Sequence, residues 1–217
     1  MVIKMIKGII FDLDGVLIST DVLHFQCWKM IADKLGIYYD EKVNSGMKGL
    51  SRAGSLDYIL SYNHLSLDDN VKEELLFEKN EKYKKMLKTL SKDDVSPDLR
   101  LTLDYLKNHG YKLAVGSSSK NTKLILKQIE IIDYFDAICD GNDVTKYKPD
   151  PEVFLKAAQM LKLKPSECYV VEDATNGIDA ATSGGFKSIG VKDASFYFKT
   201  TFKIKNIKEI IDIVKNN

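Results

Sequence analysis

The chain has 217 residues, of which 44% are hydrophobic and 29% charged, and its formal net charge is +1. This composition is typical of a globular protein of one or two domains and excludes a disordered or collagen-like chain. The balance of 32 basic and 31 acidic residues lacks the positive footprint of a nucleic-acid-binding protein. No apolar run approaches the roughly 18 residues that a bilayer-spanning helix needs, so we expect neither nucleic acid nor membrane as a partner.

The N-terminal segment and the cysteines both favour a cytoplasmic protein. The first eleven residues are apolar but interrupted by Lys4 and Lys7, and they offer no small-residue cleavage site, so they do not read as a signal peptide. Cys27, Cys139 and Cys168 are odd in number and lack CxxC spacing. We therefore expect three reduced thiols in a reducing compartment.

Five short apolar runs predict the strands of one sheet, at 7–11, 112–116, 137–139, 168–171 and 187–191. Runs this short, mostly bounded by turn residues, are typical of buried strands. Amphipathic helical patterns lie between or after them, at 98–108, 121–129, 151–161, 174–183 and 207–214. This alternation predicts an α/β fold with a Rossmann-like, doubly wound parallel sheet and right-handed crossovers.

One long stretch breaks the alternation. Between the first strand and about residue 90 the chain shows helical patterns at 23–35, 51–62 and 70–87, but no convincing strand. This predicts an inserted α-helical cap domain at 18–91. The α/β core is then discontinuous, formed by 1–17 and 92–217.

Polar side chains follow the predicted strands. Asp12 and Asp14 end the first strand, Ser117 follows the second, and Glu172 and Asp173 follow the fourth. Ligands bind beyond the carboxyl ends of parallel strands, so these groups are expected to meet. Residues two apart in extended chain share one face, and paired carboxylates suit Mg²⁺. Taken alone, the first pair is equally consistent with a polar turn; the groups at the other strand ends favour a metal site that handles phosphate.

These residues also carry a family resemblance. The segment Phe11-Asp-Leu-Asp-Gly-Val16 resembles the first motif of the haloacid dehalogenase superfamily of phosphotransferases. Ser117, Lys148-Pro149 and Glu172-Asp173 resemble its other three motifs, in the same order, and the helical insert resembles its cap. The resemblance implies that Asp12 is a nucleophile that forms an aspartyl-phosphate and that Asp14 is the general acid/base.

The same resemblance implies two further sets of residues. Mg²⁺ would be held by Asp12, by Asp14 through its backbone carbonyl, and by Asp173, with Glu172 supporting the site as a member of the metal set. The transferring phosphoryl group would be bound by Ser117, Ser118 and Lys148. The Lys148 ammonium would also offset negative charge around Asp12.

Residues of the predicted cap carry a narrower resemblance, to the β-phosphoglucomutase family within this superfamily. They include His24 and Trp28, the segment 48–56, and Lys79-Asn80. The resemblance implies a substrate site formed by Thr20, His24, Trp28, Lys48, Gly49, Arg52, Ser55, Lys79, Ser119, Lys120 and Asn121. Arg52 and 119–121 would hold a distal phosphate at the start of a helix, and His24 would hydrogen-bond near Asp14.

The implied function is Mg²⁺-dependent interconversion of β-D-glucose 1-phosphate and glucose 6-phosphate. It would proceed through the aspartyl-phosphate and glucose 1,6-bisphosphate, in a monomer whose partner is a small sugar phosphate. A phosphatase of the same superfamily that acts on small metabolites is the alternative. Asp14 argues against a dehalogenase, and the full set of catalytic groups argues against a non-enzymatic binding module. Lys79 lies in a lysine-rich stretch, so a solvated helix face is an alternative for it.

Overall fold

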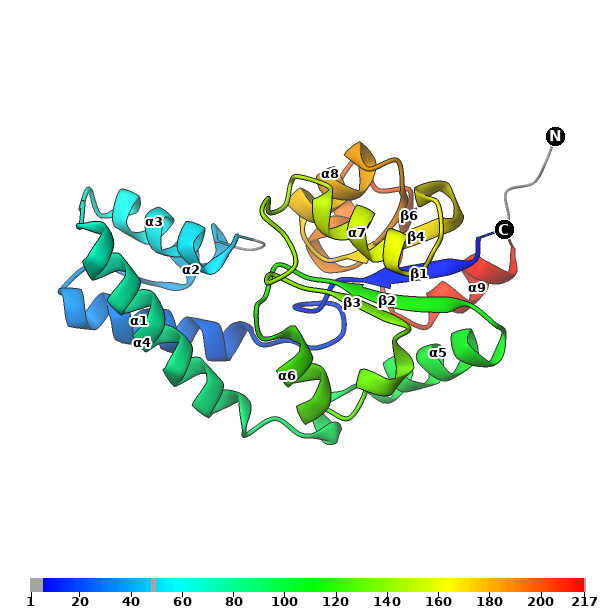
Figure 1. The fold of residues 1–217 in the computed structure, drawn as a ribbon, viewed down its shortest axis with the longest axis horizontal. Helices are drawn as coiled ribbons and strands as arrows, with labels where there is room; N and C mark the ends of the chain where they lie inside the picture. Colours follow the sequence, from blue (N-terminus) through cyan, green and yellow to red (C-terminus); the bar gives the residue numbers. More distant parts are fainter. Residues whose placement is uncertain (1–5, 48–49, 217) are drawn as a thin grey trace.

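A computed structural model describes residues 6–47 and 50–216 of the chain. Lys48 and Gly49, which the sequence places in the substrate site, lie outside the described residues. A six-stranded parallel sheet runs through the molecule in the order β3-β2-β1-β4-β5-β6 (Figure 1). Its strands are β1 (Gly8–Phe11), β2 (Lys112–Gly116), β3 (Ala137–Cys139), β4 (Cys168–Glu172), β5 (Lys187–Gly190) and β6 (Phe202–Lys203).

The central strand β1 is buried on both faces because its side chains alternate between two apolar clusters. Ile9 and Phe11 pack into the cluster on one face of the sheet, and Ile10 packs into the cluster on the other. Strand β1 pairs with β2 on one side and with β4 on the other, with Phe11 opposite Val115 and Val171. The ends of these three strands are therefore held side by side.

Helices cover both faces of the sheet. In Figure 1, α7 and α8 lie above the sheet, and α5 and α9 lie below it. Helix α7 packs against β1, β2 and β3, whereas α5 packs against β2 and α9. The bounds of the core helices are α5 (Pro97–Asn108), α6 (Thr122–Gln128), α7 (Glu152–Met160), α8 (Thr175–Ser183) and α9 (Glu209–Lys215).

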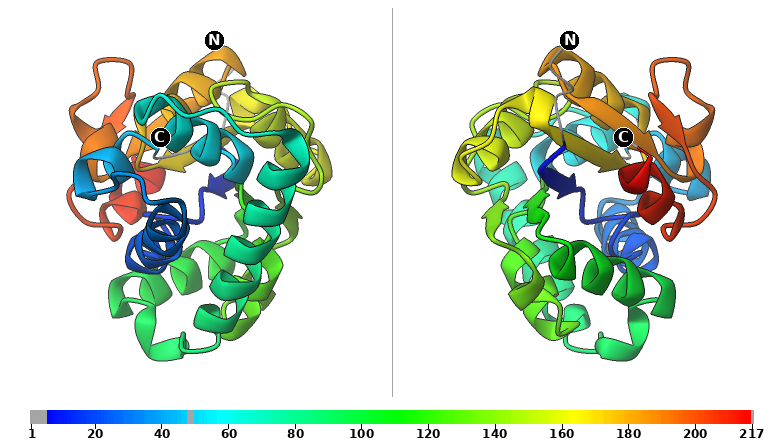
Figure 2. Two further views of the ribbon diagram at one scale, coloured as in Figure 1. Left: turned by 90° about the vertical axis from the view of Figure 1, so that its left-hand side faces the viewer. Right: turned by 90° about the vertical axis from the view of Figure 1, so that its right-hand side faces the viewer.

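The helices that follow β1 form the cap: α1 (Asp21–Leu35), α2 (Glu41–Ser45), α3 (Arg52–Tyr62) and α4 (Asp69–Leu87). They have an apolar cluster of their own, built around Trp28, Ile31, Leu56 and Ile59. The cap lies beyond the carboxyl ends of the strands, and Figure 2 shows it from its outer side. Because the chain leaves the core after β1 and returns before α5, the cap is tethered close to the end of the central strand.

The predicted fold class is confirmed, and the elements differ from the sequence expectations only in detail. The five predicted strands are present within one or two residues of their expected bounds. Strand β6 and helix α2 were not predicted, because two and five residues are too few to show a period. Cys27, Cys139 and Cys168 are buried free thiols. Among the described residues, none of the helices combines the length and the hydropathy needed to cross a bilayer.

Candidate active site

A cavity of about 280 Å³ lies between the cap and the carboxyl ends of the strands. The core side of its wall comes from the ends of β1, β2 and β4, and the cap side from α1, α3 and α4. Sequence-predicted residues that line it are Asp12, Asp14, His24, Trp28, Arg52, Ser55, Lys79, Ser117, Ser118, Ser119, Lys120, Asn121, Lys148, Glu172 and Asp173. The fold therefore gathers into one cavity residues that lie up to 161 positions apart.

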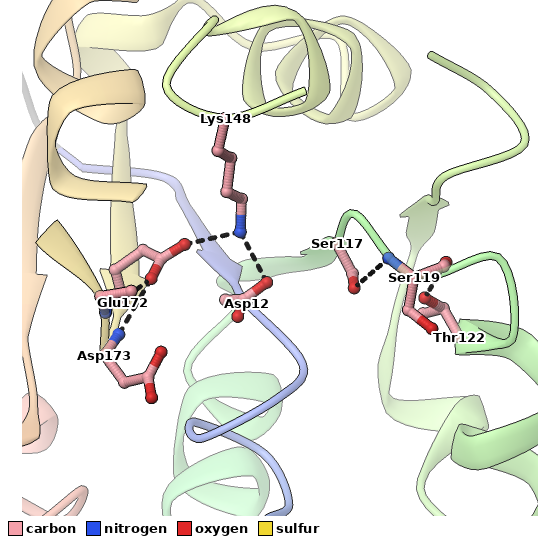
Figure 3. A network of polar contacts seen from close by, with 8 residues as sticks. Asp12, Ser117, Ser119, Thr122, Lys148, Glu172 and Asp173 are labelled. Atoms are coloured by element: carbon pink, nitrogen blue, oxygen red, sulfur yellow. Dashed lines mark hydrogen bonds and ion pairs between the residues drawn. The ribbon is translucent and has the colours of Figure 1, made fainter. Parts of the chain in front are cut away.

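Lys148 bridges two of the carboxylates at the floor of this cavity (Figure 3). Its Nζ donates to Asp12 Oδ1 and to Glu172 Oε1, each at 2.6 Å. Lys148 is only 5% exposed, so both ion pairs are shielded from water. Burial opposes its charge, but the two carboxylates outweigh burial and raise the Lys148 pKa above its usual value.

Asp12, Glu172 and Asp173 offer oxygen atoms that all lie within 4.8 Å of one another. The turn after β1 presses against this cluster: a Cβ on Gly15, where φ is +83°, would lie 1.9 Å from Asp173 Oδ2. Glycine is therefore required at this position both for its backbone conformation and for space. Glu172 Oε2 accepts hydrogen bonds from the backbone N–H groups of Asp173 and Ala174. Glu172 is thus already held by protein donors, whereas Asp173 is turned toward the cavity.

The cluster has more negative charge than Lys148 alone can neutralise. Burial, and next the Asp12 carboxylate, raise the pKa of Asp173 to about 7. Burial also raises the Glu172 pKa, although Lys148 opposes the shift. Three hard carboxylates beside a single ammonium group, which pairs with two of them, have the donor set and the charge deficit of a Mg²⁺ site. The residues present therefore fit the metal that the sequence resemblance implies.

Magnesium is expected to stabilise the folded protein through this cluster. At pH 8, 10 mM MgCl₂ should raise the melting temperature, by about 3 °C if this is tenfold above the dissociation constant, because only the folded chain gathers the ligands. Asp173→Asn should remove most of this increase. Thermal unfolding in MgCl₂ and in NaCl of equal ionic strength measures the effect; an equal rise in NaCl would contradict a specific site.

Asp14 belongs to the same turn but has a different partner. The Thr20 hydroxyl donates a hydrogen bond to Asp14 Oδ1. Burial raises the Asp14 pKa to about 7, and Thr20 only partly opposes this shift. A carboxyl group with this pKa exchanges protons readily near neutral pH, which suits a general acid/base. From the sequence we expect His24 to hydrogen-bond near Asp14. In the structure, Thr20 makes the hydrogen bond to Asp14.

Because burial favours the protonated form of Asp14, its ionisation should cost stability. The unfolded chain ionises this group near pH 4 and the folded chain near pH 7, so stability is lost as pH rises between these values. In metal-free buffer, Asp14→Asn should therefore raise the melting temperature at pH 8 by about 3 °C, corresponding to about 1 kcal/mol, and leave it unchanged at pH 4. Differential scanning calorimetry at both pH values tests this; equal effects at the two would refute it.

The loop after β2 forms the second part of the floor. The backbone N–H of Ser117 donates to the Cys139 carbonyl, and its hydroxyl accepts from the Ser119 N–H at 3.1 Å. The Thr122 hydroxyl in turn donates to the Ser119 carbonyl at 2.8 Å (Figure 3). These bonds hold a tight loop in which Ser117, Ser118 and Ser119 line the same cavity as the carboxylate cluster. Ser118 Oγ is buried with no hydrogen-bond partner among the described residues.

The cap side of the cavity is cationic and aromatic. Lys79 is only 2% exposed, so the alternative prediction, that it lies on a solvated helix face, is wrong. Its Nζ lies 2.8 Å from His24 Nδ1 and sits over the rings of Trp28 and Tyr83, at 5.0 and 4.5 Å from their centroids. Burial, and then neighbouring Arg52, lower the Lys79 pKa to about 7. The His24 ring packs on Tyr83, at 4.3 Å between centroids, which directs it to Lys79 and not to Asp14.

Arg52 is the second cation of the cap wall. It starts α3 directly after the N-cap Ser51, whose hydroxyl accepts from the Gly54 N–H. Arg52 is half-buried, and burial lowers its pKa. Sequence reasoning missed Tyr83, which lines the cavity. The i, i+4 spacing of Lys79 and Tyr83 was the available signal, because it places both on one helix face.

The fold and the cavity together define an α/β protein whose central strand ends in a buried carboxylate–lysine cluster beneath a helical cap. A family model for haloacid dehalogenase-like hydrolases matches residues 9–191. The chain therefore belongs to this family, whose members are phosphotransferases and hydrolases.

Similar proteins within the family are named for different activities. A β-phosphoglucomutase from Bacillus subtilis is 41% identical over 187 residues, covering 85% of this chain and 83% of the relative. The fructose-1-phosphate phosphatase YqaB of Escherichia coli is 32% identical, covering 85% of this chain and 96% of the relative. The crystal structure of β-phosphoglucomutase from Clostridium difficile is similar with a TM-score of 0.91 at 34% identity, and 98% of each chain is covered.

Proposed function

We propose that this protein is a Mg²⁺-dependent β-phosphoglucomutase, which interconverts β-D-glucose 1-phosphate and glucose 6-phosphate through glucose 1,6-bisphosphate. The observation that supports this proposal is that cationic and hydroxyl side chains line two sides of one cavity, each of which would bind a phosphate. The first is the floor, where Lys148 and the Ser117 loop flank Asp12. The second is the wall formed by Arg52 of the cap and 119–121 of the core. A mutase needs both places, because its bisphosphate intermediate presents each phosphate in turn.

In the first half-reaction, an Asp12 carboxylate oxygen attacks phosphorus and the bond from phosphorus to the sugar oxygen breaks. Asp14 donates its proton to that departing oxygen, and in the reverse sense it takes the proton from an attacking sugar hydroxyl. Lys148 holds Asp12 Oδ1 at 2.6 Å, which leaves Oδ2 as the oxygen for attack. The raised pKa of Asp14, about 7, lets this group work in both directions at neutral pH.

Positioning and charge supply the remaining stabilisation. Asp12, Asp173 and the supporting Glu172 would hold Mg²⁺, which when bound offsets the negative charge of the phosphoryl group. Lys148 and the Ser117 and Ser118 loop would contact the oxygen atoms of that group. The cap covers the cavity, which disfavours water as the acceptor of the phosphoryl group.

A sugar-phosphate phosphatase is the second candidate, and the relatives named as sugar phosphatases support it. It would use the same Asp12 chemistry with water as the acceptor. Phosphorus NMR on β-glucose 1-phosphate, with Mg²⁺ and trace glucose 1,6-bisphosphate, separates the two. A mutase produces glucose 6-phosphate with little free phosphate. Free phosphate as the main product would support the phosphatase and overturn the mutase.

Arg52→Ala should damage isomerisation far more than phosphoryl transfer itself. A guanidinium that pairs with a distal phosphate contributes about 2 kcal/mol, so kcat/KM for β-glucose 1-phosphate should fall about 30-fold or more. Acetyl phosphate has no distal group, and its hydrolysis should stay within about twofold. Arg52→Lys keeps the charge but loses the bidentate hydrogen bonding of the guanidinium. Its kcat/KM for β-glucose 1-phosphate should therefore lie between those of the unaltered protein and Arg52→Ala. Equal losses on both substrates would contradict a distal-phosphate role.

A further inference from the structure

A side-chain hydrogen bond joins the cap to the core at the edge of the cavity. Asn121 Nδ2 donates to Asn80 Oδ1 at 3.0 Å. Asn80 lies on α4 of the cap, one position after Lys79, and Asn121 lies in the core between the Ser117 loop and α6. Both residues are half-buried, so the bond is partly shielded from water.

The position of Asn121 leaves its side chain free for this contact. It is the residue before α6, yet its side chain makes no capping bond to that helix. Its backbone N–H instead donates to Ser119 Oγ at 3.2 Å, which anchors the main chain to the phosphate-binding loop. The Asn121 side chain is thereby left to line the cavity and to reach Asn80.

The side-chain amide of Asn121 has a hydrogen-bond donor at one end and an acceptor at the other. Its nitrogen carries two N–H donors, and its oxygen is an acceptor that would repel a phosphate. In this bond Asn80 Oδ1 is the acceptor, so the nitrogen of Asn121 lies on this side. One N–H then binds Asn80 and the second remains available to a ligand oxygen. Without Asn80, the Asn121 amide can rotate and present its oxygen to the cavity.

We propose that Asn80 is a positioning residue that orients the Asn121 amide as a donor for the distal phosphate of the substrate. This rests on the proposed function, in which 119–121 hold that phosphate. Because the two residues belong to different domains, the bond forms only when α4 lies against the core. Asn80 thus couples the position of the cap to the ability of the core to bind the distal anion.

A first experiment reads the orientation directly. The substitution Asn80→Leu keeps the branched shape of the side chain and does not lower helix propensity, but it removes the acceptor. The Asn121 side-chain amide resonances, identified by their loss in Asn121→Ala, should move upfield in Asn80→Leu as the hydrogen bond is lost. The matched variant Asn70→Ala, at an exposed site on the same helix, should leave them in place. Unchanged Asn121 resonances in Asn80→Leu would overturn the proposal.

A second experiment reads binding. Asn80→Leu should raise KM for β-glucose 1-phosphate about tenfold, with kcat and the hydrolysis of acetyl phosphate within about twofold, because the Asp12 site is untouched. In an Asn121→Ala background, Asn80→Leu should have no further effect, since both variants remove the same donor. Losses that multiply, or an unchanged KM, would overturn the proposal.

Failure of the proposed function gives a different result. If the unaltered protein releases free phosphate from hexose phosphates and does not isomerise them, the mutase proposal fails. KM for hydrolysis of glucose 1,6-bisphosphate, whose second phosphate would occupy the distal site, then takes the place of the mutase KM. A tenfold rise in Asn80→Leu, absent in the Asn121→Ala background, would still support the role of Asn80; an unchanged KM would overturn it as well.

Discussion

Replacing Asp12 by asparagine is expected to lower phosphoryl transfer by about 10⁴-fold or more. The amide nitrogen and oxygen cannot form the acyl phosphate, so the covalent step is lost and not merely slowed. The side chain keeps its size, and its oxygen can still accept from Lys148, so the fold should persist. This separates the loss of chemistry from a loss of structure.

The measurement combines turnover with trapping. Mg²⁺-dependent hydrolysis of acetyl phosphate and p-nitrophenyl phosphate gives the rate, and labelled acetyl phosphate reports the phosphorylated chain. Asp57→Asn, at an exposed carboxylate of the cap that pairs with Lys72, is the matched control and should keep both signals. If Asp12→Asn kept a tenth of the activity, the nucleophile would have to be another residue, and both candidate functions would lose their basis.

Lys148→Met is expected to have the largest effect on stability. It removes the cation that bonds both Asp12 and Glu172, and these carboxylates then face each other and Asp173 in a buried site. Breaking buried ion pairs from one side costs about 3–5 kcal/mol, which lowers the melting temperature of a chain of this length by about 10 °C. Phosphoryl transfer should fall as well, because the approaching phosphate meets uncompensated charge.

The stability loss in Lys148→Met should depend on pH with a defined sign. Without the ammonium, burial and mutual repulsion raise the carboxylate pKa values of the folded protein further above those of the unfolded chain. The folded form of Lys148→Met then takes up protons as pH falls. The difference in unfolding free energy between this variant and the unaltered protein therefore narrows from pH 8 to pH 5. Lys156→Met, at a half-exposed lysine paired with Glu152, is the control and should shift stability by about 1 kcal/mol or less. An equal loss for Lys148→Met at both pH values would refute the charge argument.

Strands and motifs were predictable because their signals are local. Apolar runs such as 168–171 are short, buried and bounded by turns, so period and length suffice to identify them. Parallel strands must present their carboxyl ends at one edge, so the positions of Asp12, Ser117 and Glu172 at the strand ends are enough to predict that they lie together. The same reasoning cannot resolve β6, because two residues show no pattern.

The cap wall was less predictable because its chemistry depends on which helix face is covered. A lysine-rich stretch has the same local pattern whether it is solvated or buried, and only packing against His24, Trp28 and Tyr83 decides that Lys79 is buried. The Thr20–Asp14 bond was missed for a similar reason. It depends on how the chain turns between β1 and α1, and not on the spacing of the two residues alone.

The sequence by itself determined the class of fold, the order of its elements and the residues at the ends of the strands, because hydrophobic period and strand direction are properties of the chain. Only the tertiary structure decided which groups touch. The approach of Asp173 to Gly15, the sharing of Lys148 by two carboxylates and the contact of Asn80 with Asn121 join residues 24 to 158 positions apart. The first two contacts are set by the pairing of the strands and their loops, and the third by the packing of the cap on the core. No local pattern encodes either.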